Sequence, residues 1–225
     1  MKQGFRFGAA EVIFNLSLDA VDAGLARGGR QLFQSLSFHL DPGEMLLVTG
    51  PNASGKSSLL RAIAGLLRLS SGYFQSASAG LPEKERPSLP EQTHFIGHSN
   101  ALKSQLTALE NLEFWQAFLS PAAADTLTQP VKSLLPVLGL AHLAQVPVAY
   151  FSAGQARRLA LLRLLVVNRP VWLLDEPVNA LDESSRRRIA GLMDQHRAKG
   201  GLIIVASHDE LGVTPSKRLR LGPEL

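Results

Sequence analysis

One short stretch of this sequence combines glycine, lysine and serine at a spacing that can hold phosphate groups. Residues 50–58 read GPNASGKSS. Its two glycines would let the backbone turn so that successive N–H groups point inward, and its lysine would reach phosphate oxygens. The hydroxyl of Ser57 is suited to bind Mg²⁺. An ordinary glycine turn is the alternative, but an apolar strand before and an apolar helix after the stretch disfavour it. The predicted phosphate-binding residues are Gly50, Pro51, Asn52, Ala53, Ser54, Gly55, Lys56, Ser57 and Ser58.

A second candidate lies where an apolar run ends in two acidic residues. Residues 171–177 read VWLLDEP, which places Asp175 and Glu176 directly after the run. In a parallel sheet the carboxyl end of a strand faces the ligand crevice, where the strand before Gly50 would also deliver its loop. We therefore predict that Asp175 holds Mg²⁺ and that Glu176 is the general base that activates water. Alone, such an acidic turn is also typical of an ordinary strand end. The presence of the glycine loop in the same chain favours the interpretation as a catalytic and metal-binding turn.

A third stretch, FSAGQARR, begins at Phe151 and opens the helix that leads into the acidic strand. Taken alone it is typical of an ordinary helix start, with Ser152 as the cap and the arginines facing solvent. Its place between the glycine loop and VWLLDEP makes the chain resemble the ATP-binding cassette (ABC) ATPases, whose signature reads LSGGQ. The resemblance covers about residues 17–222. It implies that Ser152, Gly154 and Gln155 contact the nucleotide.

Three further positions resemble motifs of that family. NALD, which ends at Asp182, resembles the family's D-loop, and the resemblance implies another contact to the nucleotide. His208 in ASHDE resembles the switch histidine and is implied to be catalytic, although a lone histidine after an apolar strand is more often structural. His98 stands where most members carry a glutamine. The resemblance implies that His98 faces the Mg²⁺ and links it to the helical part of the chain; the alternative is a histidine that only packs there.

The chain departs from the general ABC pattern at several positions, and these departures indicate one subgroup of the family. His98 and Ala153 replace the usual glutamine and glycine, and no aromatic residue lies near Ala26–Arg30, where many members stack adenine on a tyrosine. The stretches IGHSNALKSQLTALENL, FSAGQARRLALLRLL and TPSKRLRLG are similar to the ATP-binding subunit of the cytochrome c maturation heme exporter. In that group the glutamine position is similarly histidine and the signature similarly carries alanine.

The resemblance implies an ATP-hydrolysing enzyme that uses ATP and Mg²⁺ and drives export. In the family two copies associate head to tail on ATP binding, so Ser152 of one copy would contact the γ-phosphate held by the other. The implied partners are the permease subunits of the heme-export complex, and the implied location is peripheral, at the cytoplasmic face of the inner membrane. Two alternatives remain open: an ABC ATPase of an unrelated exporter, or a soluble ABC ATPase that acts on nucleic acid or ribosomes.

Composition supports a folded protein and excludes several kinds of site. The chain has 225 residues, of which 45% are hydrophobic, which is ordinary for a packed domain. Its formal net charge is only +4, and the basic residues are mostly scattered, which argues against a nucleic-acid partner. The absence of cysteine excludes disulfides, thiolate metal sites and cysteine nucleophiles. We expect no membrane span and no secretion signal.

The elements that must position these residues alternate between strands and helices. Such alternation predicts an α/β fold with a mainly parallel sheet covered on both faces. Together with the glycine loop, the resemblance implies a P-loop NTPase core with an antiparallel β portion and an inserted α-helical lobe. We predict a single domain over residues 1–225, with its nucleotide-binding core in residues 17–97 and 156–225 and its lobe, including the signature, in residues 98–155. The expected strands are 16–21, 32–40, 44–49, 94–97, 171–175 and 202–207; the expected helical segments are 57–69, 106–119, 131–146, 156–167 and 183–199; and the expected exposed loop is 76–92.

Overall fold

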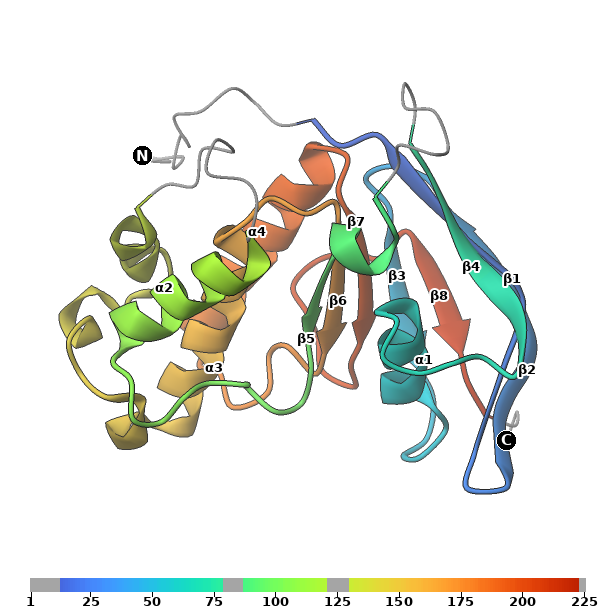
Figure 1. Ribbon diagram of the computed structural model, residues 1–225, viewed down its shortest axis with the longest axis horizontal. Helices are drawn as coiled ribbons and strands as arrows, with labels where there is room; N and C mark the ends of the chain where they lie inside the picture. Colours follow the sequence, from blue (N-terminus) through green and yellow to red (C-terminus); the bar gives the residue numbers. More distant parts are fainter. Residues whose placement is uncertain (1–12, 79–86, 121–129, 223–225) are drawn as a thin grey trace.

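The computed structural model describes residues 13–78, 87–120 and 130–222. A five-stranded parallel sheet stands in the middle of the molecule (Figure 1). Helix α1 and a three-stranded antiparallel sheet lie on one side of it, and α2, α3 and α4 lie on the other. This arrangement confirms the predicted mixed α/β fold with an antiparallel portion and a helical lobe. The boundaries predicted between lobe and core stay a prediction.

The parallel sheet is nearly all apolar because both of its faces are covered. Its strand order is β5-β6-β7-β3-β8, and every neighbouring pair is parallel. The ends of β3 and β6 therefore lie at the same edge of the sheet, separated by β7. The strands are β5 (Thr93–Ile96), β6 (Val171–Asp175), β7 (Leu202–Ala206), β3 (Met45–Thr49) and β8 (Lys217–Arg220).

The antiparallel sheet has the order β2-β1-β4, with β1 (Leu16–Arg27), β2 (Arg30–Leu40) and β4 (Ser71–Ser78). Strand β4 was not predicted, and assigning residues 76–78 to an exposed loop was wrong. None of the eight β4 residues is buried, so the strand lacks the alternation of buried and exposed residues that would have predicted it. Its antiparallel pairing with β1 identifies it as a strand. Residues 79–86 of the predicted loop lie outside the described residues, and Pro90–Gln92 form a 3₁₀ turn.

Within the described residues, the four α-helices begin close to the predicted positions, and two of them end earlier than predicted. Helix α1 stops at Ile63 instead of residue 69, because Gly65 adopts a φ of 74° and ends the helix. Helix α3 likewise ends before the predicted residue 167 and continues as the 3₁₀ turn Arg163–Leu165. The helices are α1 (Lys56–Ile63), α2 (Ala108–Leu119), α3 (Ala153–Leu162) and α4 (Glu183–Ala198).

The second helical segment of the lobe is not an α-helix. Residues Val131–Leu138 form a 3₁₀ helix with Pro136 inside it, followed by shorter 3₁₀ turns at Ala141–Leu143 and Val148–Tyr150. Proline lacks the N–H that an α-helix needs at its interior positions, so the apolar spacing was helical but the segment could not be a regular α-helix. Gly139, with a φ of 71°, then turns the chain.

Two apolar clusters fill the space on either side of the parallel sheet. Alternate residues of one strand point to opposite clusters: Leu46 and Val48 face α1 and the antiparallel sheet, whereas Met45 and Leu47 face the other helices. The cluster that contains Met45 and Leu47 runs without a break from the sheet through α3 and α4 into the lobe, where it includes Leu112 of α2. The lobe is therefore held to the sheet by one continuous core.

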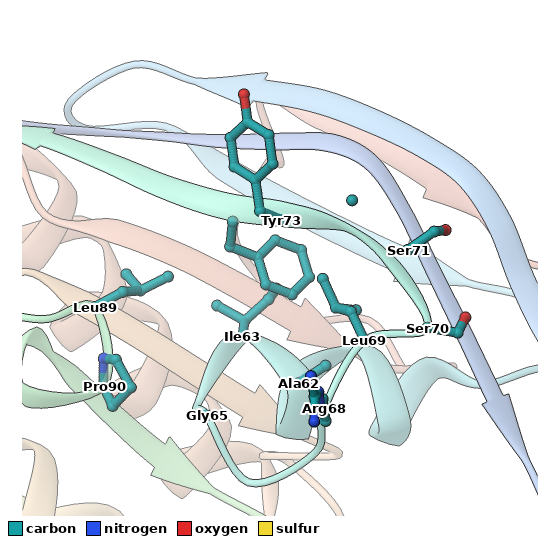
Figure 2. A pocket seen from close by; sticks show the side chains of 12 residues that line it. Ala62, Ile63, Gly65, Arg68, Leu69, Ser70, Ser71, Tyr73, Leu89 and Pro90 are labelled. Atoms are coloured by element: carbon teal, nitrogen blue, oxygen red, sulfur yellow. The ribbon is translucent and has the colours of Figure 1, made fainter.

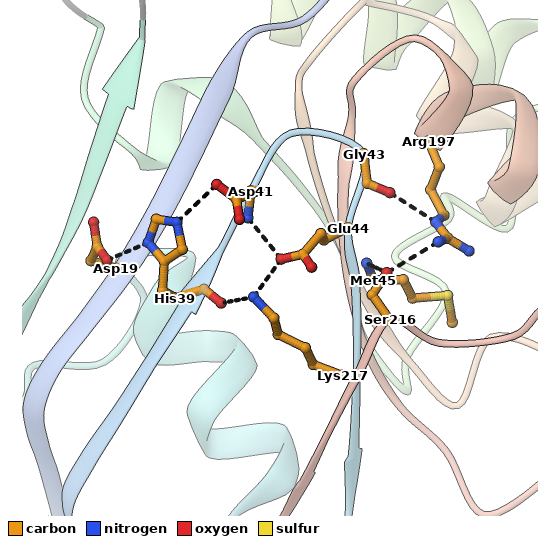
Figure 3. A network of polar contacts seen from close by, with 9 residues as sticks. All are labelled: Asp19, His39, Asp41, Gly43, Glu44, Met45, Arg197, Ser216 and Lys217. Atoms are coloured by element: carbon orange, nitrogen blue, oxygen red, sulfur yellow. Dashed lines mark hydrogen bonds and ion pairs between the residues drawn. The ribbon is translucent and has the colours of Figure 1, made fainter.

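Polar contacts join the antiparallel sheet to the edge of the parallel sheet (Figure 3). The Lys217 ammonium of β8 donates to the backbone oxygen of His39 in β2 at 2.8 Å and to Glu44 Oε2 at 2.6 Å. The His39 ring lies between Asp19 of β1 and Asp41 of the following turn, at 2.6 and 3.1 Å. Hydrogen bonds to these two carboxylates raise the pKa of His39.

Candidate functional site

The glycine loop connects β3 to α1, and its two glycines take conformations that other residues avoid. Gly50 has a φ of 137°, and a Cβ there would lie 2.1 Å from the backbone oxygen of Leu221. Gly55 has a φ of 102° at the N-cap of α1, and a Cβ there would lie 3.2 Å from Leu32 Cβ. No side chain caps α1. The loop therefore leaves the start of this helix open to an anion, as phosphate binding requires.

The ammonium group of Lys56 is held inside the loop. Its Nζ donates to the backbone oxygens of Gly50 at 2.8 Å and Pro51 at 2.9 Å, and the residue is only 9% exposed. A positive charge therefore already stands at the centre of the loop. The other predicted loop residues differ in exposure: Ser54 and Ser58 are buried, Ser57 is half-buried, and Pro51, Asn52 and Ala53 are exposed.

The fold brings the glycine loop and the acidic strand end into direct contact. Ser57 Oγ donates to Asp175 Oδ1 at 3.0 Å, although the two residues are 118 positions apart in the sequence. Asp175 is only 3% exposed, and its second oxygen, Oδ2, is buried without a hydrogen-bond partner among the described residues. A buried carboxylate oxygen without a partner is costly unless a cation or donor reaches it. A hydroxyl and a carboxylate are also the hard oxygen ligands that Mg²⁺ prefers, so the two residues fit the predicted metal.

Glu176 is fixed at the ends of β6 and β7. Its backbone is left-handed, with a φ of 48°, which is uncommon for a residue with a side chain. Its N–H donates to the backbone oxygen of Ala206 at 2.8 Å, and its Oε2 accepts a hydrogen bond from Ser207 Oγ at 3.1 Å. His208 follows Ser207 and is exposed. The predicted switch histidine is thus the next residue in the chain after the serine that binds the predicted base.

The signature stretch forms the start of α3, with Ser152 as its N-cap. Ser152 Oγ accepts from the Gln155 N–H at 3.2 Å, and Gln155 Oε1 accepts from the Ser152 N–H at 2.8 Å. The Gln155 side chain is therefore engaged in capping, and its role toward a nucleotide stays a prediction, as does that of exposed Ser152. A Cβ on Gly154 would lie 2.8 Å from the backbone oxygen of Ala180, so α3 begins directly against the NALD segment.

The last two predicted residues lie at the surface. Asp182 is the N-cap of α4 and accepts from the Ser185 N–H at 2.7 Å; hydrogen bonds to Ser185 lower the pKa of its carboxyl group. His98 is exposed in the segment that follows β5. In the part of the chain that the structure describes, no group of three or more His, Cys, Asp or Glu residues is arranged to hold a metal. The predicted contact between His98 and Mg²⁺ stays a prediction.

Sequence reasoning gave no role to two residues that hydrogen-bond the acidic turn, Ser207 and Arg157. Arg157 of α3 was given no role, but it is only 5% exposed and hydrogen-bonds the backbone of the acidic turn at Asp175, Glu176 and Pro177. In the sequence, Arg157 stands two residues before Leu159, which is buried. This position indicates only that Arg157 belongs to the helix that carries the signature; it does not indicate that its side chain is buried. No sequence signal distinguishes it from Arg158, which is half-buried and donates to a lobe carbonyl.

A hollow of about 440 Å³ lies at the opposite end of α1 from the glycine loop (Figure 2). Ile63, Leu69 and Pro90 contribute apolar side chains to it, and Arg68 and Tyr73 lie at its border. Because α1 has eight residues and rises about 1.5 Å per residue, roughly 12 Å separates the two ends. The hollow is therefore separate from the residues that could hold phosphate.

None of the helices in the described ranges 13–78, 87–120 and 130–222 is long and apolar enough to cross a membrane.

Comparison with known proteins agrees with this geometry. The ABC transporter family matches residues 33–179. Among curated relatives, the chain is 46% identical to the cytochrome c biogenesis ATP-binding export protein CcmA of Nitrobacter winogradskyi, over 87% of this chain and 93% of that one. It is 42% identical to the protein of the same name from Rhizobium etli, over 92% of this chain and 94% of that one.

Solved structures support the fold. An ABC transporter ATP-binding protein from Pyrococcus furiosus superposes with a TM-score of 0.73 at 20% identity, covering 91% of this chain and 97% of that one. An ATP-binding subunit of another ABC transporter gives a TM-score of 0.71 at 23% identity, covering 85% and 79%. This chain is an ATP-binding, ATP-hydrolysing member of the ABC transporter family, as its glycine loop, acidic strand end and signature helix indicated.

Proposed function

We propose that this chain is the ATP-hydrolysing subunit of an ABC exporter that supplies heme for cytochrome c biogenesis. The observation that carries the proposal is the contact between Ser57 and Asp175, beside Glu176, in a chain that shares 46% identity with a cytochrome c biogenesis export protein. The contact supports the ATPase chemistry, and the similarity over most of both chains supports the biological role.

The glycine loop would bind the phosphates of ATP. The Lys56 ammonium now donates to two loop carbonyls, and phosphate oxygens are stronger acceptors that would replace them. Ser57 and Asp175 would hold Mg²⁺, which supplies neutralisation of the charge on the phosphates when it is bound. Asp175 Oδ2 has the free acceptor capacity for this role.

Glu176 would act as the general base. Its Oε2 is oriented by the Ser207 hydroxyl, which leaves the other carboxylate oxygen to accept a proton from the attacking water. His208, the residue after Ser207, is exposed and would orient the reacting phosphate from the same edge of the sheet. The transferred proton would rest on Glu176 until the products leave.

A second copy of the chain would complete the site. Ser152 and Asp182 cap the starts of α3 and α4, and both residues are exposed. An exposed helix start with a serine hydroxyl is suited to bind an anion that another molecule presents. We therefore propose a head-to-tail homodimer in which Ser152, Gly154, Gln155 and Asp182 of one copy face the ATP of the other.

The helical lobe would bind the permease. Three aromatic residues of α2 form what we name the α2 aromatic patch: Phe114, Trp115 and Phe118, with ring centroids 5.6–6.1 Å apart. Phe118 is 64% exposed and Phe114 is 37% exposed. Exposed aromatic clusters of this kind mark interaction surfaces. The proposed partners are the permease subunits of the heme exporter, at the cytoplasmic face of the inner membrane, where the chain would be peripheral.

Glu176→Gln tests the chemistry with little change in shape. The amide oxygen can still accept from Ser207, but it cannot take a proton, so hydrolysis should fall by roughly 10²–10⁴-fold while ATP still binds. The mutant should accumulate as an ATP-bound dimer in gel filtration. Glu183→Gln, at an exposed position of α4, is the matched control and should hydrolyse ATP normally. A fully active Glu176→Gln protein would exclude Glu176 as the base.

The same variant tests the biological role. In cells whose only copy carries Glu176→Gln, heme-stained c-type cytochromes should disappear, and the control Glu183→Gln should restore them. Normal cytochrome levels in cells that carry a hydrolysis-deficient protein would assign the ATPase to a different exporter.

A further inference from the structure

Arg157 uses its whole guanidinium group for hydrogen bonds inside the protein. The residue is 5% exposed, and its five N–H donors are matched by five acceptors. One terminal nitrogen donates to the backbone oxygens of Asp175 at 2.6 Å and Glu176 at 2.8 Å, and Nε donates to that of Pro177 at 3.3 Å. The other terminal nitrogen donates to the backbone oxygen of Gly97 at 2.8 Å and to Asn100 Oδ1 at 3.2 Å. No donor is left for water or a ligand.

Three of these acceptors belong to the acidic turn, residues 175–177. There the chain leaves β6: Asp175 is the last residue of the strand, and Glu176 and Pro177 lie beyond it. The turn also contains Glu176 in its left-handed conformation, which persists only where surrounding contacts hold it. One planar, rigid donor group that binds three successive carbonyls is such a contact.

The remaining two acceptors belong to the segment that leaves β5. Gly97 and Asn100 flank His98, and both are half-buried. Arg157 itself lies in the second turn of α3, five residues after the exposed cap Ser152. A single side chain therefore connects the helix that carries the signature with both the acidic turn and the segment after β5.

The charge of Arg157 suits this place. Burial lowers the pKa of its guanidinium, and the nearby carboxylates of Asp175 and Glu176 raise it again. The guanidinium binds the backbone carbonyls of the turn, whereas the hydroxyls of Ser57 and Ser207 bind the side-chain carboxylates of Asp175 and Glu176. The turn is held from both sides.

We propose that Arg157 is a positioning residue for ATP hydrolysis that aims Glu176 through the backbone of the acidic turn. Because the guanidinium is carried by α3, a shift of that helix would displace the turn and change that aim. The inference rests on the proposed function, since it assigns Arg157 a role toward the proposed base. Because all five of its donors are used inside the protein, Arg157 would act only through Glu176 and its neighbours.

Arg157→Lys tests the role while keeping the charge. A lysine ammonium is a point donor and cannot bind acceptors of both loops as a planar fork does. We expect kcat for ATP hydrolysis to fall by roughly 10²-fold, the size of effect that a displacement of about 1 Å produces. The KM for ATP and the affinity for a fluorescent ATP analogue should change little, because the glycine loop is untouched.

Arg163→Lys is the matched control. Arg163 is a second buried arginine directly after α3, but it donates to Ala160 of its own segment and lies over the Trp115 ring at 4.3 Å. Both variants should lower Tm, and only Arg157→Lys should lower kcat by more than severalfold. Equal kcat in the two variants, or a loss in Arg157→Lys that appears in KM and nucleotide affinity alone, would overturn the proposal.

Asn100→Ala provides a second, milder test if Arg157→Lys folds poorly. It removes one of the five acceptors, and we expect kcat to fall by roughly two- to tenfold, as the loss of one hydrogen bond predicts. An unchanged kcat in both Asn100→Ala and a folded Arg157→Lys protein would also overturn the proposal. Glu176→Gln, measured in the same series, separates the two ideas: if it remains active, the proposed base is wrong whatever Arg157 does.

Discussion

Two buried histidines should make the folded state sensitive to acid. His94 in β5 is 4% exposed and His196 in α4 is 6% exposed. His94 Nε2 lies 2.7 Å from the backbone oxygen of Val167, and His196 Nε2 lies 3.1 Å from that of Pro170. Each of these ring nitrogens donates, so each ring is satisfied as a neutral imidazole. The His196 ring also stacks on Trp172, with centroids 3.9 Å apart.

Burial lowers the pKa of His94 to about 3 and that of His196 to about 4, from 6.5. In the unfolded chain both rings would bind a proton as the pH falls below 6.5, whereas in the folded chain they stay neutral. Their contribution to stability is therefore complete above pH 6.5 and is lost as the pH falls toward the folded pKa values. At pH 5.0 the loss is about 2 kcal/mol for each ring and about 4 kcal/mol for both.

Urea unfolding at pH 7.5 and pH 5.0 measures this loss. In His94→Gln the amide can still donate to Val167, but it does not titrate, so the loss between the two pH values should shrink by about 2 kcal/mol. His142→Gln, at an exposed lobe position, is the control and should lose as much as the wild type. His39, whose pKa is raised by hydrogen bonds to Asp19, acts in the opposite direction and is present in every variant. An equal loss in all three proteins would refute the reasoning.

Three further outcomes test the site. Lys56→Ala should lower the affinity for a fluorescent ATP analogue at least about tenfold, because a charge-assisted contact is worth roughly 1.5–3 kcal/mol; unchanged affinity would exclude the loop as the binding site. Gly154→Ala places a Cβ 2.8 Å from the backbone oxygen of Ala180 and should lower the free energy of unfolding by about 1–3 kcal/mol, measured in urea. Gly191→Ala is the control: a Cβ there meets open space and should raise the free energy of unfolding by about 0.5–1 kcal/mol. His98→Gln should retain basal ATPase activity but respond less to added permease subunits, and identical stimulation would contradict a coupling role.

The sequence alone determined the parts of this protein that depend on neighbouring residues. The glycine loop, the acidic end of β6 and the serine cap of α3 each lie within a few consecutive residues, so backbone conformation and local hydrogen bonds specify them. Strands with continuous apolar runs were also predictable, because a strand covered on both faces has no polar alternation. Where a residue acts within its own turn, as Pro136 does in the lobe, its local chemistry overrides the apolar spacing around it.

Only the tertiary structure decided which distant residues meet. Strand β4 exists through its pairing with β1, since its own residues are exposed or half-buried. The hydroxyl of Ser57 reaches Asp175 because the strand order places β3 and β6 on either side of β7, with their ends at one edge. Arg157 and Arg158 are adjacent and chemically identical, yet only Arg157 has its donors surrounded by carbonyls of two other loops. Burial of a charged group depends on what packs against it from elsewhere in the chain, and a linear sequence does not contain that information.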